Sequence, residues 1–188
     1  HFAVVGAYGA DDYTGAAYVY IFQDSSWVEL QKLTASDGGN YFSFGDDVAI
    51  YDSTIIIGAS RDGEGGSNAG AAYVFEWEDG LFIQKTKLLP NEVSPYDRFG
   101  RAVAVFQNKV LIGASRDDSN EENGGAAYLF EKTGNDWILI EKIAPNLFTK
   151  EARFGSAVSL SEFHMAIGGY NYSENGICSG AVYVQEID

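Results

Sequence analysis

The chain has 188 residues, of which 46% are hydrophobic, and a formal net charge of −15 from 12 Lys plus Arg against 27 Asp plus Glu. This hydrophobic fraction excludes a disordered tail, and the strong negative charge repels phosphate backbones, so nucleic-acid binding is not expected. No apolar run approaches the roughly 18 residues of a membrane-spanning helix, so membrane insertion is not expected either.

Short apolar stretches bounded by turn residues predict β-strands along the whole chain. Residues 1–41 hold three of these stretches. Residues 42–96 hold four, at 43–51, 53–59, 70–76 and 81–88, which we name strands a, b, c and d. Residues 97–151 repeat all four, and residues 152–188 hold only a, b and c. Helical spacing is sustained nowhere, so the chain is predicted to be all-β, with the strands in antiparallel meanders.

One unit recurs along the chain with a constant step. GAAYVF or a near copy of it begins at Gly15, Gly70, Gly125 and Gly180, each 55 residues after the last, and the pair Phe-Gly recurs at 44–45, 99–100 and 154–155. A fixed period of this length indicates one supersecondary unit whose copies bury their apolar faces on one another. Lys32, Lys87 and Lys142 share the step. They form either a ring of ligand contacts or, as their recurrence favours, salt bridges between sheets.

Units that read FG, VAI, IGAS and GAAYVF resemble the FG-GAP repeat, the blade unit of integrin alpha-subunit propellers and of many surface proteins. The Gly-Ala pairs at 6–7, 58–59 and 113–114 fit that pattern, and Gly168-Gly169 departs from it. The resemblance implies a β-propeller of four-stranded blades around a central channel. It also implies an extracellular or cell-surface location and a role in adhesion or recognition.

Counting strands gives two complete blades, at 42–96 and 97–151, and partial blades at 1–41 (b, c, d) and 152–188 (a, b, c). A propeller closed by its own two ends would build one four-stranded blade from them, but here each end supplies three strands. The smallest propeller also has about four blades. We therefore expect a single segment of a larger propeller, or open edges completed by other polypeptide, including further copies of the chain. The start at His1, without Met or a signal peptide, suggests a processed or truncated beginning.

Calcium is not expected in the a–b turns, where integrin-type units carry an Asp-rich loop. Residues 51–53, 106–109 and 161–164 do not supply the several oxygen ligands that Ca²⁺ needs, so the prediction is no cofactor and no metal. A looser metal site among Asp62 and Glu64, or among Asp117, Asp118 and Glu121, remains open.

No catalytic constellation is present. The two histidines, His1 and His164, offer no partner to the recurring Ser60 and Ser115, so an enzyme is not expected. Cys178, the single cysteine, is interpreted as a buried small apolar residue, or as one that pairs with chain outside these residues. Asn171 begins the one N-glycosylation pattern, Asn-Tyr-Ser, and glycosylation there would support a secretory route.

The long b–c and d–a connections are expected on one face, because strand direction alternates along a blade. Scaffolded loops on one face are where binding usually resides, and in integrins this is the ligand-binding face. The same residue types also occur simply because turns need them. The candidates for ligand contact are Asp11, Asp12, Arg61, Asp62, Glu64, Arg116, Asp117, Asp118 and Glu121.

These observations predict a non-enzymatic module that binds a protein or glycan ligand through the b–c and d–a loops. The alternative is an architectural repeat in a surface or fibrous assembly, with the open blade edges as contacts. Net acidity favours a basic or cation-bridged partner.

Overall fold

The computed structural model describes residues 1–144, 149–173 and 176–187, and within them the chain forms four antiparallel sheets. The first contains β1 (Phe2–Ala7), β2 (Ala16–Gln23) and β3 (Ser26–Leu33). The second contains β4 (Phe44–Tyr51), β5 (Thr54–Ala59), β6 (Ala71–Glu78) and β7 (Leu81–Leu88). The third contains β8 (Phe99–Phe106), β9 (Lys109–Ala114), β10 (Ala126–Thr133) and β11 (Asp136–Ile143). The fourth contains β12 (Phe154–Leu160), β13 (His164–Gly169) and β14 (Ala181–Glu186).

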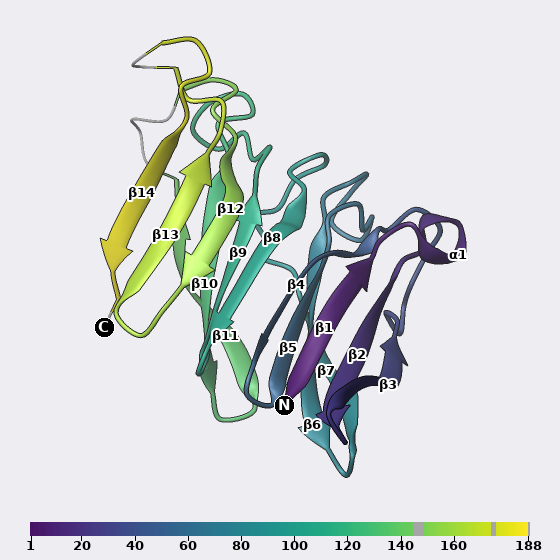
Figure 1. The fold of residues 1–188 in the computed structure, drawn as a ribbon. Helices are drawn as coiled ribbons and strands as arrows, with labels where there is room; N and C mark the ends of the chain where they lie inside the picture. The colour runs from purple at the N-terminus through teal and green to yellow at the C-terminus, as the bar shows by residue number, and fades with distance from the viewer. Residues whose placement is uncertain (145–148, 174–175, 188) are drawn as a thin grey trace.

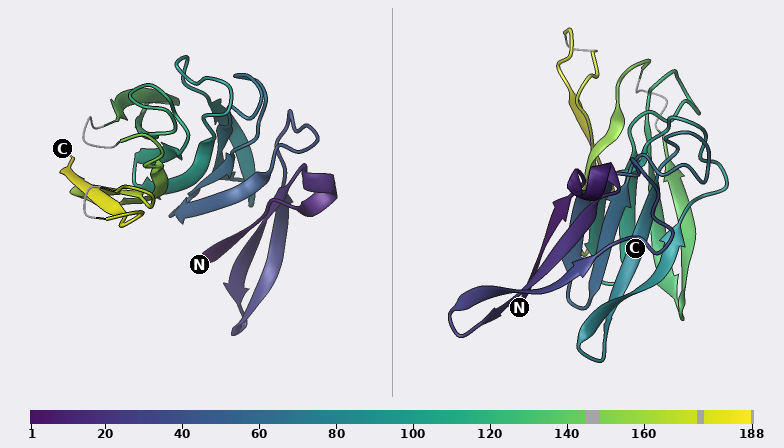
Figure 2. Two further views of the ribbon diagram at one scale, coloured as in Figure 1. Left: turned by 90° about the horizontal axis from the view of Figure 1, so that it is seen from above. Right: turned by 90° about the vertical axis from the view of Figure 1, so that its right-hand side faces the viewer.

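Each sheet is a meander in which neighbouring strands in sequence are neighbours in space, as predicted. The sheets stand side by side, with the long connections at the upper end in Figure 1. Seen from above they follow one another round an arc, as the blades of a propeller do (Figure 2). The prediction of an all-β fold is therefore confirmed, and the observed strand ends differ from the expected ones by one or two residues.

The one helical assignment among the described residues is a single turn, α1 (Ala10–Tyr13). Asp11 and Asp12 have φ of 50° and 55°, so the turn lies in the left-handed region and is no right-handed helix. No helix in the described part of the chain is long and apolar enough to cross a membrane.

The two recurring sequence signatures meet where one sheet joins the next. Parallel bridges pair Gly15 with Phe44, Gly70 with Phe99 and Gly125 with Phe154. At the middle junction the Phe99 N–H donates to the Ala69 carbonyl at 2.8 Å, and φ at Gly70 is +89°. A Cβ on Gly70 would lie 2.0 Å from the Phe99 carbonyl oxygen, so this junction requires glycine.

The glycine of the recurring Gly-Ala pair also allows close approach of two backbones, here between a strand of one sheet and the first strand of the next. A Cβ on Gly58 would lie 1.9 Å from the Gly100 carbonyl oxygen, and one on Gly113 would lie 1.9 Å from that of Gly155. At Gly168, where the sequence departs from the family pattern, the nearest atom would be 3.6 Å away. Gly58 and Gly113 thus allow the first strand of the next sheet to approach.

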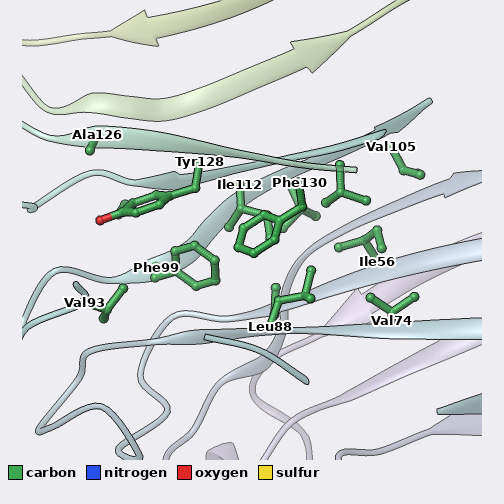
Figure 3. Packing of buried hydrophobic residues seen from close by; sticks show 14 of the residues in the cluster. Ile56, Val74, Leu88, Val93, Phe99, Val105, Ile112, Ala126, Tyr128 and Phe130 are labelled. Carbon is green, nitrogen blue, oxygen red and sulfur yellow. The ribbon is translucent and has the colours of Figure 1, made fainter. Parts of the chain in front are cut away.

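Apolar side chains fill three layers, one between each pair of neighbouring sheets. In the layer between the second and third sheets, Phe99 packs edge-to-face on Tyr128, with ring centroids 5.3 Å apart (Figure 3). Ile56 and Val74 come from the second sheet and Ile112 and Phe130 from the third (Figure 3). The repeat therefore recurs because every copy must fill the same layer against its neighbour.

Candidate recognition face

The two ends of the sheets differ in the length of their connections. One end, which we call the loop face, carries the described parts of the b–c segments 8–15, 60–70, 115–125 and 170–180 and of the d–a segments 34–43, 89–98 and 144–153 (Figure 1). Residues 145–148 and 174–175 lie outside the described residues. The other end, the turn face, carries two- or three-residue turns at 24–25, 52–53, 79–80, 107–108, 134–135 and 161–163. The sequence expectation that long loops gather at one end agrees with this geometry.

Two of the acidic candidates lie beneath the loop face rather than on it. Asp62 is 0% exposed and Asp117 is 2% exposed. One carboxylate oxygen of Asp62 accepts the backbone N–H of Glu64, and one of Asp117 accepts the backbone N–H of Ser119, both at 2.9 Å. The other oxygen accepts the hydroxyl of Tyr73 at 2.8 Å or that of Tyr128 at 2.7 Å. Both carboxylates are therefore occupied in holding the b–c loop on its own sheet.

The recurring lysines complete this arrangement. Lys87 Nζ lies 2.7 Å from Asp37, 2.8 Å from Asp62 and 2.8 Å from Glu64, and sits over the Tyr73 ring. Burial alone lowers the pKa of Lys87, but the hydrogen bonds to these three carboxylates raise it above its usual value. Because Asp37 belongs to the d–a segment that enters the second sheet, Lys87 ties that segment to the b–c loop.

The third and first sheets contain versions of the same arrangement. Lys142 Nζ lies 3.0 Å from Asp117 and 3.7 Å from Glu92, over the Tyr128 ring. Lys32 pairs with Asp11 at 2.7 Å in an exposed position. Burial, reinforced by Asp117, raises the pKa of Tyr128 above its usual range, so Tyr128 stays a hydrogen-bond donor. These contacts favour a structural role of the lysines over a ring of ligand contacts, but the ion pairs join each sheet to its own b–c loop and to a d–a segment, not one sheet to the next as expected.

No group of three or more His, Cys, Asp or Glu with metal-binding geometry occurs in the part of the chain that the structure describes. The carboxylates of Asp37, Asp62 and Glu64 converge on one point, and the ammonium of Lys87 is the cation there. The remaining acidic candidates, Asp12, Asp118 and Glu121, are exposed on the loop face.

The arginine candidates lie in a different setting. Arg61 is exposed and Arg116 is partly buried, and both lie just after the second strand of their sheet. The structure brings Arg61 to a pocket of about 390 Å³ together with Arg98, Arg101, Tyr8, Ser43 and Asp46. Sequence reasoning missed Arg98 and Arg101. The signal that could have found them is positional, since all five arginines of the chain flank the ends of a or b strands that meet at the loop face.

Two further predictions concern the fourth sheet. The interpretation of Cys178 as a buried apolar residue is wrong, because its side chain is exposed in the b–c loop, where the Ser173 hydroxyl accepts its N–H at 3.1 Å. Asn171 occupies the repeat position of Arg61 and Arg116, and its N–H donates to the Ala152 carbonyl at 3.2 Å. Both residues therefore lie at the loop face.

Comparison with known proteins supports the resemblance. A family model of the FG-GAP repeat matches residues 27–75 and 82–130. No curated protein matches the chain. The two matched stretches span more than half of the sequence and include the Phe-Gly and Gly-Ala-Ala-Tyr signatures that meet at the junctions between sheets. The chain belongs to the FG-GAP repeat family.

Proposed function

We propose that the chain is a non-enzymatic recognition or adhesion module that works outside the cell and binds a protein or glycan partner through the loop face. The observation that carries this proposal is the asymmetry of the two ends. Among the described residues, the long connections lie at the loop face and the connections at the turn face are two or three residues long. Loops held on a rigid scaffold are the usual location of binding sites.

The loop face also has the side chains that binding surfaces favour. Tyr8, Tyr13 and Tyr41 are all about half exposed or more, and their rings lie in a row with centroids 6.5 and 6.2 Å apart. Tyr and Arg are the residues most enriched at the energetic centres of protein interfaces. The hydrogen bonds and ion pairs beneath the loops hold them in place, which reduces the entropy lost on binding.

The exposed thiol of Cys178 allows a direct test. Phage from a random peptide library would be selected on the protein, and binding of the selected peptides would be measured after coupling of maleimide-polyethylene glycol to Cys178. We expect coupling at this loop-face position to block most of the peptides. The matched control carries Ser53→Cys and Cys178→Ser, which moves the polymer to the turn face. Blocking by the control and not by the Cys178 conjugate would contradict the proposal.

One observation favours the alternative of an architectural repeat in a surface or fibrous assembly, in which the open end of this segment is the contact. On β14, Val182 and Val184 are 68% and 60% exposed, while Val74 and Leu129, at the repeat positions of Val184, are buried. An apolar sheet face of this kind is buried by the next sheet elsewhere in the chain. Sedimentation of the chain alone should reveal association that Val184→Lys removes. A monomer at all concentrations would count against this alternative.

A further inference from the structure

The arginine cluster breaks the symmetry of the repeat. The residue before each Phe-Gly pair is Ser43, Arg98 or Arg153, and the residue after it is Asp46, Arg101 or Ser156. A residue needed for assembly should recur in every unit, as the Tyr and Lys of the buried network do. Only at the start of the third sheet are both positions arginine. Contact with the second sheet accounts for Arg101, which pairs with Asp46, but not for Arg98.

Three of the five arginines of the chain have no acidic partner among the described residues. Among the described residues, Arg61, Arg98 and Arg116 form no ion pair, although the sequence contains 27 Asp plus Glu. Arg101 pairs with Asp46 at 3.2 Å, and Asp46 also accepts the Ser60 hydroxyl. The pocket lined by Arg61, Arg98 and Arg101 contains this single carboxylate, so positive charge is in excess.

Like charges are held together here at an energetic cost. Arg98 is partly buried, and burial together with the nearby Arg116, Arg61 and Arg101 lowers its pKa below the usual value. Backbone hydrogen bonds fix the segments that carry these residues. The Arg61 N–H donates to the Phe42 carbonyl at 3.2 Å, the Arg98 N–H to Asn68 at 3.3 Å and the Arg116 N–H to Asp97 at 3.1 Å. The backbone positions from which the arginines project are therefore fixed, and an anion in the pocket would relieve the repulsion between the guanidinium groups.

We propose that the pocket formed by Arg61, Arg98 and Arg101 binds a carboxylate of a partner protein, from an Asp or Glu side chain or a chain terminus. The planar guanidinium fork matches a carboxylate in two-point geometry. Tyr8, at 52% exposed, forms one wall and begins the row of exposed tyrosines, which suits a polypeptide that lies across the loop face.

The surroundings of the pocket disfavour a long polyanion. Asp12, Asp118 and Glu121 are exposed on the same face, and the whole chain carries −15, so an extended sulfated glycan would meet repulsion along that face. A single acidic group on an otherwise neutral segment avoids that repulsion. This inference rests on the proposed recognition role of the loop face, and it replaces the expected basic partner by an acidic group at this one position.

The arginine side chains provide the measurement. In ¹⁵N-labelled protein, the Nε–H signals of the five arginines would be followed by NMR during titration with a blocked peptide Gly-Tyr-Glu-Gly and with its Gln counterpart. We expect the Glu peptide to shift the signals of Arg61, Arg98 and Arg101. Arg153 is the internal control, because its guanidinium already bonds Asn123 at 2.7 Å and Glu151 at 2.5 Å. The Gln peptide should cause no such shifts.

Substitutions distinguish this site from general charge attraction. Arg61→Gln and Arg98→Gln should each weaken the Glu peptide about tenfold, the effect of losing one charge-assisted hydrogen bond. Arg153→Gln should leave its affinity unchanged. Arg61 is exposed, so its variant remains informative if Arg98→Gln lowers the melting temperature.

Three outcomes would overturn the proposal: shifts that include Arg153 equally, affinity unaffected by both pocket variants, or binding of a heparin-derived tetrasaccharide in place of the Glu peptide. If peptides from the phage selection bind the loop face and Arg61→Gln does not change their affinity, this inference is wrong. The proposed function is not contradicted by that result.

Discussion

Lys87 Nζ lies 2.8 Å from Oδ2 of Asp62, and Asp62 is fully buried. Burying an ionised carboxylate is costly unless it is paired and hydrogen-bonded, and here Lys87, Tyr73 and a backbone N–H supply those partners. The pair fastens the b–c loop to the sheet. It also explains why an acidic residue that looks like a ligand contact in the sequence recurs with the structural repeat.

Removing the ammonium should be strongly destabilising. Lys87→Met keeps the aliphatic stem but leaves Asp37, Asp62 and Glu64 facing one another, so the free energy of unfolding should fall by about 3–5 kcal/mol at pH 7. Urea denaturation would measure this loss. The control is Lys32→Met, which removes an exposed pair with Asp11 and should leave the denaturation midpoint nearly unchanged. Equal effects in the two variants would show that burial of the pair is not what matters.

A methyl group at a junction between sheets should also destabilise the fold. Gly113→Ala places Cβ 1.9 Å from the Gly155 carbonyl oxygen, and the third and fourth sheets must separate to admit it. We expect a loss of about 2–3 kcal/mol, as for overpacking of a tight interior. Gly168→Ala, at the same repeat position, meets nothing closer than 3.6 Å and should change the melting temperature little. If both variants melt alike, close approach is not the reason for the recurring glycine.

Asp97 should make stability depend on pH. Burial, reinforced by the charge of Asp117, raises the pKa of Asp97 to about 6, although the Ser94 N–H and Lys142 act against the rise. The folded pKa exceeds the unfolded value of about 3.9, so this contribution to stability is complete below pH 4 and is lost as pH rises through 6.

The neutral isostere tests this sign. At pH 8 the free energy of unfolding of Asp97→Asn should exceed that of the parent by about 1–2 kcal/mol, and this difference should shrink towards pH 4. Asp52→Asn, at an exposed turn, serves as the control and should follow the parent at every pH. Melting curves at four pH values would suffice. A stability difference that grows as pH falls would contradict the assignment.

The a–b turns should bind no Ca²⁺. Asp52 is the only carboxylate in the turn 52–53, and the turn 107–108 has none. Calorimetric titration should find no micromolar site there. Micromolar binding that persists after Glu64, Asp118 and Glu121 are all changed to their amides would show that the turns do hold the ion.

Asn171 should carry a glycan in material from the native source. The residue lies in the b–c loop of the fourth sheet, beside the exposed Ser173 and Cys178. Peptide mass spectrometry before and after removal of N-glycans would detect the modification. Finding Asn171 fully unmodified would remove this support for a secretory route.

The architecture can be predicted from the repeat pattern alone. A step of 55 residues, with Phe-Gly and Gly-Ala-Ala-Tyr in fixed register, predicts one four-stranded unit repeated, and the strand ends follow to within two residues. This works because alternation of apolar residues, turn residues and obligatory glycines are local properties that act on each unit alike. The matching family model rests on the same features.

Which polar side chains of the loop face are exposed depends instead on tertiary contacts. In the sequence Arg61 and Asp62 are adjacent and equally plausible as ligand contacts, yet Asp62 turns inward to Tyr73 and Lys87 while Arg61 turns to a pocket with Arg98 and Arg101. The burial of a side chain and the partners it meets depend on segments brought together from different sheets. A repeat period cannot encode these contacts at positions where successive units differ, as at Asp46 and Arg101. The repeated Asp62, Tyr73 and Lys87, by contrast, fasten the b–c loop to its own sheet, a contact that every unit can make within itself.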